Sequence, residues 1–187
     1  IIAGSGPTDR NGNSQFTQNN SLKLLAEGLA ENKIASVRYD KRGIGESKNA
    51  AVTEENLRFE HYTDDVTAWI QLLKEKKLFS KIIIMGHSEG SLIGMVAAGN
   101  ADKFISIAGT GLPADEILKE QLKNQPQSVL EMSEPIIESL KKGIIVQNIN
   151  PMLNSLFRPS VQPYLISWFK YNPQEEIKKI KIPILIL

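Results

Sequence analysis

The chain is 187 residues long, which suits one generous domain or two small ones. Hydrophobic residues make up 41% of it and charged residues 23%, and the formal net charge is +1. This composition is that of a globular protein and excludes a disordered chain or a polybasic nucleic-acid tail. There is no cysteine, so disulfides, thiolate metal sites and a cysteine nucleophile are excluded, and the only histidines are His61 and His87. No apolar run reaches the ~18 residues of a membrane-spanning helix.

Short apolar runs rich in isoleucine and valine recur along the chain and do not alternate with polar residues. Such runs are typical of strands buried on both faces of a parallel sheet. The five predicted strands are Ile1–Gly4, Ile34–Tyr39, Lys81–Gly86, Phe104–Ala108 and Ile182–Leu187.

Helical patterns lie between these runs. Ser21–Glu31 has apolar residues three and four apart, with Ser21 as its predicted N-cap. Thr63–Lys77 begins with acids and ends with lysines, an order that complements the helix dipole. Ser88–Gly99 is nearly all small or apolar, as suits a helix packed against a sheet. The alternation of strand and helix predicts an α/β fold with a doubly wound, mostly parallel sheet.

The pattern changes after Gly111, where about seventy residues pass before the next predicted strand. Prolines punctuate this stretch, and most of its predicted helices are amphipathic. We expect a helical cap or lid at residues 111–180, inserted into a core of residues 1–110 and 181–187. The predicted cap helices are Pro113–Asn124, Gln127–Lys142, Pro151–Phe157 and Val161–Lys170.

The strongest chemical signal is the sequence Gly86-His87-Ser88-Glu89-Gly90, which follows a predicted strand and opens a predicted helix. A G-x-S-x-G motif in this strand–turn–helix setting predicts a nucleophile elbow, with the hydroxyl of Ser88 exposed above the end of the sheet. Glycines two residues before and after the serine allow strand and helix to approach closely. The alternative is a tight turn with a buried, inert serine.

A second glycine-containing loop, Ala3–Arg10, directly follows the first predicted strand. Acyl transfer needs two backbone N–H groups aimed at the developing oxyanion, one of them from the residue after the nucleophile, here Glu89. We expect Ser5 to supply the other, with Gly6 as the alternative donor. The loop could instead be a plain turn, whereas the phosphate-binding motifs G-x-x-x-x-G-K-[ST] and G-x-G-x-x-G do not occur in it.

With these loops and the charged segment Arg38–Ser47, the chain resembles α/β-hydrolase-fold serine hydrolases of the serine-aminopeptidase-like (S33-type) branch, especially bacterial carboxylesterases with a Gly-Ser-Gly-Pro-Thr-Asp-Arg loop. The resemblance implies that the predicted strands are the third to seventh of that fold, incomplete at both ends, with a cap after the sixth. It also implies that the acid and the histidine of the catalytic triad lie beyond Leu187. Arg38–Ser47 is expected to be a scaffold for the catalytic face rather than a substrate contact.

Other titratable residues fit the triad less well. In this fold the chain order is serine, acid, histidine, and His61 precedes Ser88. His87 is expected to pack locally, and Asp102 belongs at the wrong end of the sheet. Asp115, just past the fourth predicted strand, is a minor alternative for the acid.

Aromatic residues of the predicted cap have two interpretations. They can pack the cap itself, or they can line an acyl pocket. The residues concerned are Phe157, Tyr164 and Trp168.

The sequence therefore predicts a serine hydrolase that cleaves small-molecule carboxylic esters through an acyl-enzyme on Ser88, with no metal or organic cofactor and no nucleic-acid partner. Peptidase or thioesterase activity on the same machinery is the near alternative, and a non-catalytic hydrolase-like binding domain is the distant one. A chain that begins at Ile1 within an apolar run is expected to be a piece of a longer protein, nearly inactive by itself, and both cytoplasm and export remain open.

Overall fold

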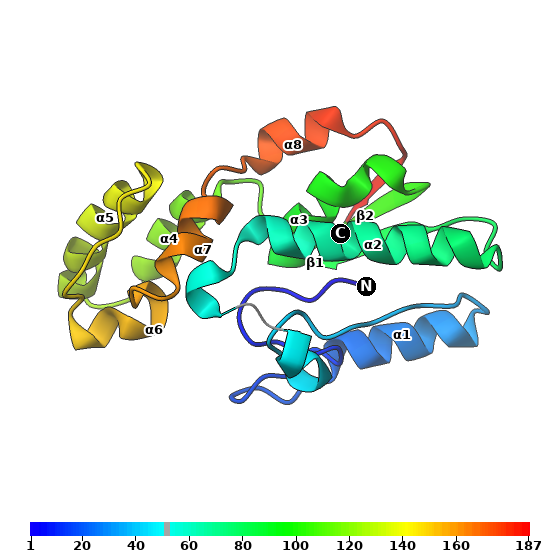
Figure 1. Cartoon of the computed structure of the whole chain (residues 1–187), viewed down its shortest axis with the longest axis horizontal. Coiled ribbons are helices and arrows are strands. Elements are labelled where there is room, and N and C mark those ends of the chain that lie inside the picture. Colours follow the sequence, from blue (N-terminus) through cyan, green and yellow to red (C-terminus); the bar gives the residue numbers. More distant parts are fainter. Residues whose placement is uncertain (51–52) are drawn as a thin grey trace. The chain divides into compact units, whose positions relative to one another are not determined.

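The computed structural model describes residues 1–50 and 53–187, and the chain divides into two compact units. Unit 1 consists of Ile1–Ala51, Tyr62–Thr110 and Ile177–Leu187, and unit 2 consists of Val52–His61 and Gly111–Glu176. Figure 1 labels their elements.

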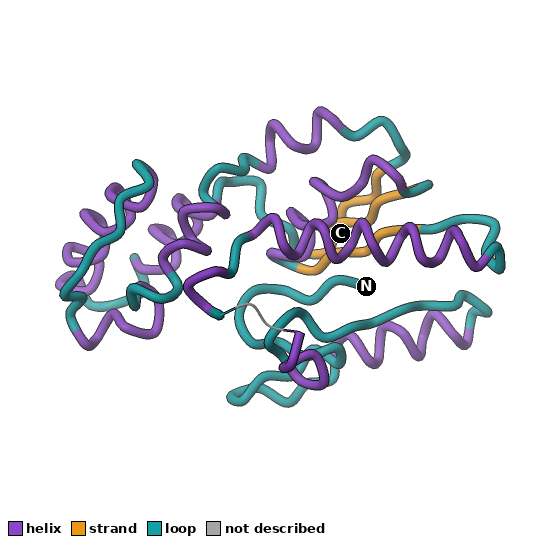
Figure 2. The backbone as a smooth tube through the Cα atoms, viewed as in Figure 1, coloured by secondary structure: helices purple, strands orange, loops and turns teal. Residues whose placement is uncertain are grey.

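Unit 1 contains a three-stranded parallel sheet in the order β1-β2-β3, drawn in orange in Figure 2. The strands are β1 (Ile83–His87), β2 (Lys103–Ile107) and β3 (Ile184–Ile186). In the register, Ile84 lies opposite Phe104, and Phe104 lies opposite Ile184. Three of the five predicted strands are confirmed, and all run parallel because each is reached by a crossover containing helices.

The two N-terminal strand predictions differ from the structure. Ile2 forms a single parallel bridge with Gly86, in which the Ile2 N–H donates to Met85 O (2.8 Å). Residues 34–39 are extended but form no strand among the described residues, and Val37 O accepts a hydrogen bond from the Ile1 nitrogen (2.8 Å). The strand prediction at Ile34–Tyr39 is therefore wrong, because a strand needs a repeated ladder of backbone hydrogen bonds. The bond to Val37 and the bond from the Ile34 N–H to Leu29 O (2.9 Å) do not form such a ladder.

The helices of unit 1 follow the amphipathic pattern. They are α1 (Ser21–Glu31), α2 (Phe59–Lys76, which starts in unit 2) and α3 (Glu89–Ala97), with short 3₁₀ turns at Gly45–Ala50 and Ala98–Asn100. The predicted N-cap of α1 is wrong by one residue. Asn20 holds that position with φ 53°, a left-handed conformation that asparagine tolerates, and Asn19 Oδ1 accepts from the Ser21 N–H (2.9 Å).

The core of unit 1 forms where α3 packs against β1 and β2. Ile93 on α3 and Phe104 on β2 are completely buried, and Ile84 is 5% exposed. Gly94 lets the helix approach the sheet, since a Cβ there would lie 2.9 Å from the side chains of Ile84 and Phe104. This packing fixes the start of α3, and therefore Ser88, relative to the end of β1.

Unit 2 is helical. Its apolar centre includes Ile137, Leu140 and Phe157, none of which is exposed. Four predicted helical segments are confirmed with shifted ends. The 3₁₀ turn at Glu54–Asn56 and helix α8 (Pro173–Lys179, which ends in unit 1) lacked a sequence signal because both are short and polar. The helical segments after residue 111 are α4 (Ala114–Leu122), α5 (Gln127–Lys141), a 3₁₀ turn (Pro151–Leu153), α6 (Asn154–Phe157), α7 (Gln162–Trp168) and α8 (Pro173–Lys179).

Residues 53–61 are attached to this unit by contacts that the sequence pattern did not predict. Glu54 forms an ion pair with Arg158, and the Phe59 N–H donates to Ser167 Oγ (2.8 Å). The ring of Phe59 packs against that of Tyr171 with centroids 4.8 Å apart.

Gln162 holds a loop of unit 2 in place. Its side chain is fully buried, its Nε2 donates to Phe157 O (2.7 Å) and Val146 O (2.9 Å), and its Oε1 accepts from the Val146 N–H (2.7 Å). The amide therefore satisfies backbone groups that neither helix nor sheet reaches. Within the described parts of the chain, no helix is both long and apolar enough to span a membrane.

Candidate active site

Ser88 occupies a strained turn between β1 and α3. Its φ is 54° and its ψ is −121°, a region that residues with side chains rarely adopt. Its N–H donates to Ile107 O on β2 (2.9 Å), which fixes the turn at the carboxyl ends of the strands. The strain that the G-x-S-x-G motif predicts for its central serine is thus present in the backbone.

The two glycines of the motif are required by contact with backbone. A Cβ on Gly86 would lie 2.1 Å from Gly90 O, and a Cβ on Gly90 would lie 2.6 Å from the carbonyl oxygens of Ile2 and Ala3. Real Cβ atoms do not approach backbone so closely. Glycine alone therefore allows the N-terminal segment at Ile2 and Ala3, β1 and α3 to meet beside Ser88.

The loop at Gly4–Gly6 lies next to the Ser88 turn. A Cβ on Gly4 would be 3.3 Å from Ser88 Cβ, and Gly6 has φ 73°, which favours glycine. Within the described residues nothing accepts a hydrogen bond from the Ser5 N–H. The loop therefore places an unpaired amide close to the serine.

A cleft of about 230 Å³ opens between Ser88, His87 and the loop at Gly4 and Ser5. All of its lining belongs to unit 1. The described residues around it include no aspartate, glutamate, lysine or arginine. The rest of its lining includes the hydroxyl- and amide-bearing residues Thr8, Ser14, Thr17, Asn19 and Ser21.

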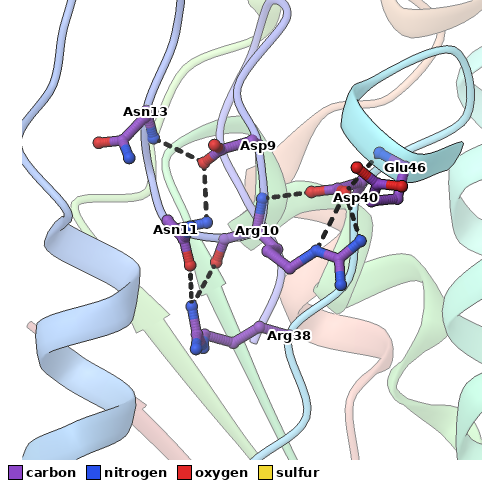
Figure 3. Close-up of polar contacts among 7 residues, drawn as sticks. All are labelled: Asp9, Arg10, Asn11, Asn13, Arg38, Asp40 and Glu46. Carbon is purple, nitrogen blue, oxygen red and sulfur yellow. Dashed lines mark hydrogen bonds and ion pairs between the residues drawn. The ribbon is translucent and has the colours of Figure 1, made fainter. Parts of the chain in front are cut away.

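Asp40 connects this loop to the segment Arg38–Ser47, as Figure 3 shows. The carboxylate is 5% exposed and accepts from the Arg10 N–H (2.6 Å), Arg10 Nε (3.0 Å), Arg10 Nη2 (2.6 Å) and the Glu46 N–H (3.0 Å). Burial by itself raises the pKa of Asp40, but the hydrogen bonds from Arg10 and Glu46 outweigh it and hold that pKa below its ordinary value of 3.8.

Further contacts in the same figure stiffen the loop. Asp9 Oδ1 accepts from the backbone N–H groups of Asn11 (2.8 Å) and Asn13 (2.9 Å). Arg38 Nη1 donates to Arg10 O (3.1 Å) and Asn11 Oδ1 (2.5 Å). These bonds link the segment Arg38–Ser47 to the loop at residues 9–13, and its role as a scaffold for the catalytic face stays a prediction.

Lys41 and Glu89 form a buried ion pair below the turn. Both side chains are 2% exposed, and Lys41 Nζ lies 3.1 Å from Glu89 Oε2. The same ammonium donates to Gly4 O (2.6 Å) and lies 5.0 Å from the centre of the Tyr62 ring. Burial, followed by the charges of Glu89 and Asp65, raises the pKa of Tyr62, so this ring stays neutral beside the pair.

The other titratable candidates, Asp102, His61 and Asp115, are not among the described residues that line the cleft. Asp102 accepts from the Ile82 N–H (2.7 Å) at the opposite end of the sheet. His61 Nδ1 accepts from the Arg58 N–H (3.2 Å), and Asp115 forms a 2.7 Å ion pair with Lys141; both residues belong to unit 2.

The three aromatic pocket candidates also lie in unit 2. Phe157 is completely buried and Tyr164 is 8% exposed, and the rings of Tyr164 and Trp168 lie 6.0 Å apart. They pack within their own unit, and a role in an acyl pocket stays a prediction.

The sequence analysis missed the roles of Asp40 and Lys41. A signal existed, because two charged residues directly follow the apolar run Ile34–Tyr39. Charges at that position end up buried when they satisfy backbone groups of neighbouring loops, and single-sequence patterns do not show which loops are neighbours.

Comparisons of the sequence and of the fold with known proteins find esterases. Esterase EstD of Thermotoga maritima is 28% identical over 194 residues, covering 100% of this chain but 44% of that protein, so the chain spans less than half of its relative. An esterase from Thermogutta terrifontis, solved with malate bound, superposes with a TM-score of 0.56 at 19% identity and covers 99% of this chain and 68% of that one.

A lipase-esterase related protein from Clostridium acetobutylicum gives a TM-score of 0.53 at 20% identity, over 99% of this chain and 71% of that one. At such identities these structures show the fold, which is an incomplete α/β-hydrolase fold. Residues 18–155 match the family described as Serine aminopeptidase, S33. The chain therefore belongs to the Serine aminopeptidase, S33 family of α/β-hydrolases.

Proposed function

We propose that the complete protein is a serine hydrolase that cleaves carboxylic esters through Ser88. The observation that carries the proposal is the strained Ser88 turn, with φ 54°, beside the unpaired Ser5 amide in one cleft. Strain of this kind persists where surrounding structure enforces it, and it is frequent at active sites.

In the proposed reaction, Ser88 Oγ attacks the ester carbonyl carbon while its proton passes to a histidine, which we place beyond Leu187 with its orienting acid. The N–H groups of Ser5 and Glu89 stabilise the oxyanion. The tetrahedral intermediate collapses, the C–O bond breaks, and the alcohol leaves with the proton from the histidine. Water then attacks the acyl-enzyme by the same sequence, releasing the acid and restoring Ser88.

A panel of p-nitrophenyl esters tests this proposal on the complete protein. Turnover is expected for the wild type, with a loss of about 10³-fold or more in kcat for Ser88→Ala. The matched control is Ser91→Ala, which removes a serine hydroxyl one helical turn away. Ser91 Oγ bonds Ser106 Oγ (2.7 Å) and does not line the cleft, so its variant should keep wild-type turnover. Equal turnover by Ser88→Ala and wild type contradicts the proposal.

Peptidase activity is the second candidate, favoured by the family match. The acyl chemistry is shared, and the leaving group is an amine rather than an alcohol. Aminoacyl p-nitroanilides, assayed in the same preparations, distinguish the two activities. Faster specific turnover of anilides than of esters would favour the peptidase.

A further inference from the structure

We propose that Lys41 is a positioning residue for the oxyanion hole. Its ammonium sets the direction of the Ser5 N–H and anchors Glu89, the residue that carries the other donor. The inference rests on the proposed function and assigns a role to a residue that does not itself line the cleft.

The geometry of one peptide group determines the direction of the Ser5 N–H. Gly4 C=O and Ser5 N–H belong to the same planar unit, and no peptide bond in the described chain is cis. In a trans peptide these two groups point in opposite directions. Lys41 Nζ holds the carbonyl at 2.6 Å on the buried side, so the N–H of Ser5 is turned away from Lys41.

The charge of Lys41 also polarises the peptide group between Gly4 and Ser5. A cationic donor on a carbonyl gives a short, strong hydrogen bond, and it draws electron density from the attached amide. The Ser5 N–H consequently becomes a better donor to a developing negative charge. With a neutral residue at position 41, the peptide group between Gly4 and Ser5 would be less polarised and freer to rotate.

Lys41 also contacts Glu89, the residue that carries the other proposed oxyanion donor. The same ammonium lies 3.1 Å from Glu89 Oε2, and the Tyr62 ring lies 5.0 Å away on α2. Because both charged side chains are 2% exposed, neither can move into water without unpacking the turn. One buried cation thereby links the loop before Ser88 to the residue after it.

The experiment replaces Lys41 by methionine in the complete protein. A kcat lowered by about tenfold or more is expected at nearly unchanged KM, because the lost stabilisation belongs to the transition state. Arg42→Met is the matched control. Arg42 is on the same loop but pairs with Asp65 (2.6 Å), so its variant removes an equal charge and should retain wild-type kcat.

A second variant separates positioning from folding. Lys41→Met removes the buried cation beside the Glu89 carboxylate, whereas Lys41→Met/Glu89→Met removes both charges and keeps the Glu89 N–H. The double variant is expected to recover thermal stability while kcat stays low. Wild-type kcat in the double variant would overturn the inference.

A third readout is the rate ratio between an ester and its thionoester. Sulfur accepts hydrogen bonds weakly, so an oxyanion hole favours the oxygen substrate, and Lys41→Met should lower this ratio severalfold. A lowered kcat with an unchanged ratio would overturn the positioning role and leave the proposed function intact. If the Ser88→Ala variant kept the turnover of the wild type, the proposed function would be overturned, and this inference with it.

Discussion

Asp40 illustrates how one ionised side chain can hold two loops together. It receives hydrogen bonds from Arg10 on the first loop and from Glu46 on its own segment (Figure 3). A carboxylate with several N–H partners is stabilised in its charged form, so folding and ionisation are coupled.

This coupling predicts a pH dependence of stability. Because the pKa of Asp40 is lower in the folded state than in the unfolded state, its contribution is fully present above the unfolded value, near pH 4, and is lost as pH falls through the folded pKa. Asp40→Asn should lower the free energy of unfolding by about 2 kcal/mol at pH 7. Urea unfolding from pH 7 to pH 2 should show a smaller acid-induced loss for this variant than for wild type; identical losses would contradict the assignment.

At the residue scale, the sequence predicted the strained turn at Ser88 and its two close-packed glycines, because their motif acts locally, within five residues. It did not identify Lys41, whose partners Gly4 and Glu89 are 37 and 48 residues away. Contacts at such separations depend on how loops meet, which a single sequence does not encode in any short pattern.

At the element scale, the junction of β1 and α3 depends on the absence of side chains at Gly86 and Gly90. Gly86→Ala would bring a Cβ within 2.1 Å of Gly90 O, which requires the backbone itself to move. We expect this variant to lose about 3 kcal/mol or more of stability, and to lose activity through displacement of Ser88. Thermal unfolding checks the first expectation and ester turnover the second.

The control for this prediction is Gly28→Ala on α1. A Cβ there meets nothing within 4 Å, and alanine favours helix over glycine. Stability should rise by roughly 0.5–1 kcal/mol with unchanged turnover. Equal effects of the two substitutions would show that the close contact at Gly86 has no energetic importance.

Helices whose apolar residues recur at a regular spacing could be predicted from the sequence. Short helices, and segments whose state depends on a neighbouring strand, could not. The bounds of α1 agree with the sequence, because Leu22 and Ala26 mark one buried face. Residues 34–39 have the composition of a buried strand, yet composition does not state whether a hydrogen-bonding neighbour is present. Helix α8 was missed because Ile177 is its one strongly apolar residue.

At the scale of the whole molecule, the chain has two compact units, each with its own buried residues. The sequence indicated a helical stretch after Gly111 from its prolines and amphipathic periods. It gave no indication that residues 53–61 pack with that stretch, since Glu54 and Arg158 are 104 residues apart. The role of unit 2 as a lid stays a prediction.

Gln162→Ala tests whether unit 2 has its own local stability. The substitution removes the partners of Val146 and Phe157 backbone groups, so hydrogen exchange should accelerate in residues 143–157. Exchange in β1 and α3 should remain at the wild-type rate, as measured by mass spectrometry of peptides from the complete protein. Equal acceleration in both units would show that they open together.

Treatment of the folded, complete protein with a fluorophosphonate, followed by peptide mass spectrometry, tests whether Ser88 is a reactive nucleophile. The serine oxygen displaces fluoride and becomes phosphonylated, and we expect a single adduct on Ser88, absent from Ser88→Ala and retained in Ser91→Ala. An unlabelled wild type, or an adduct of equal yield in Ser88→Ala, would contradict this expectation.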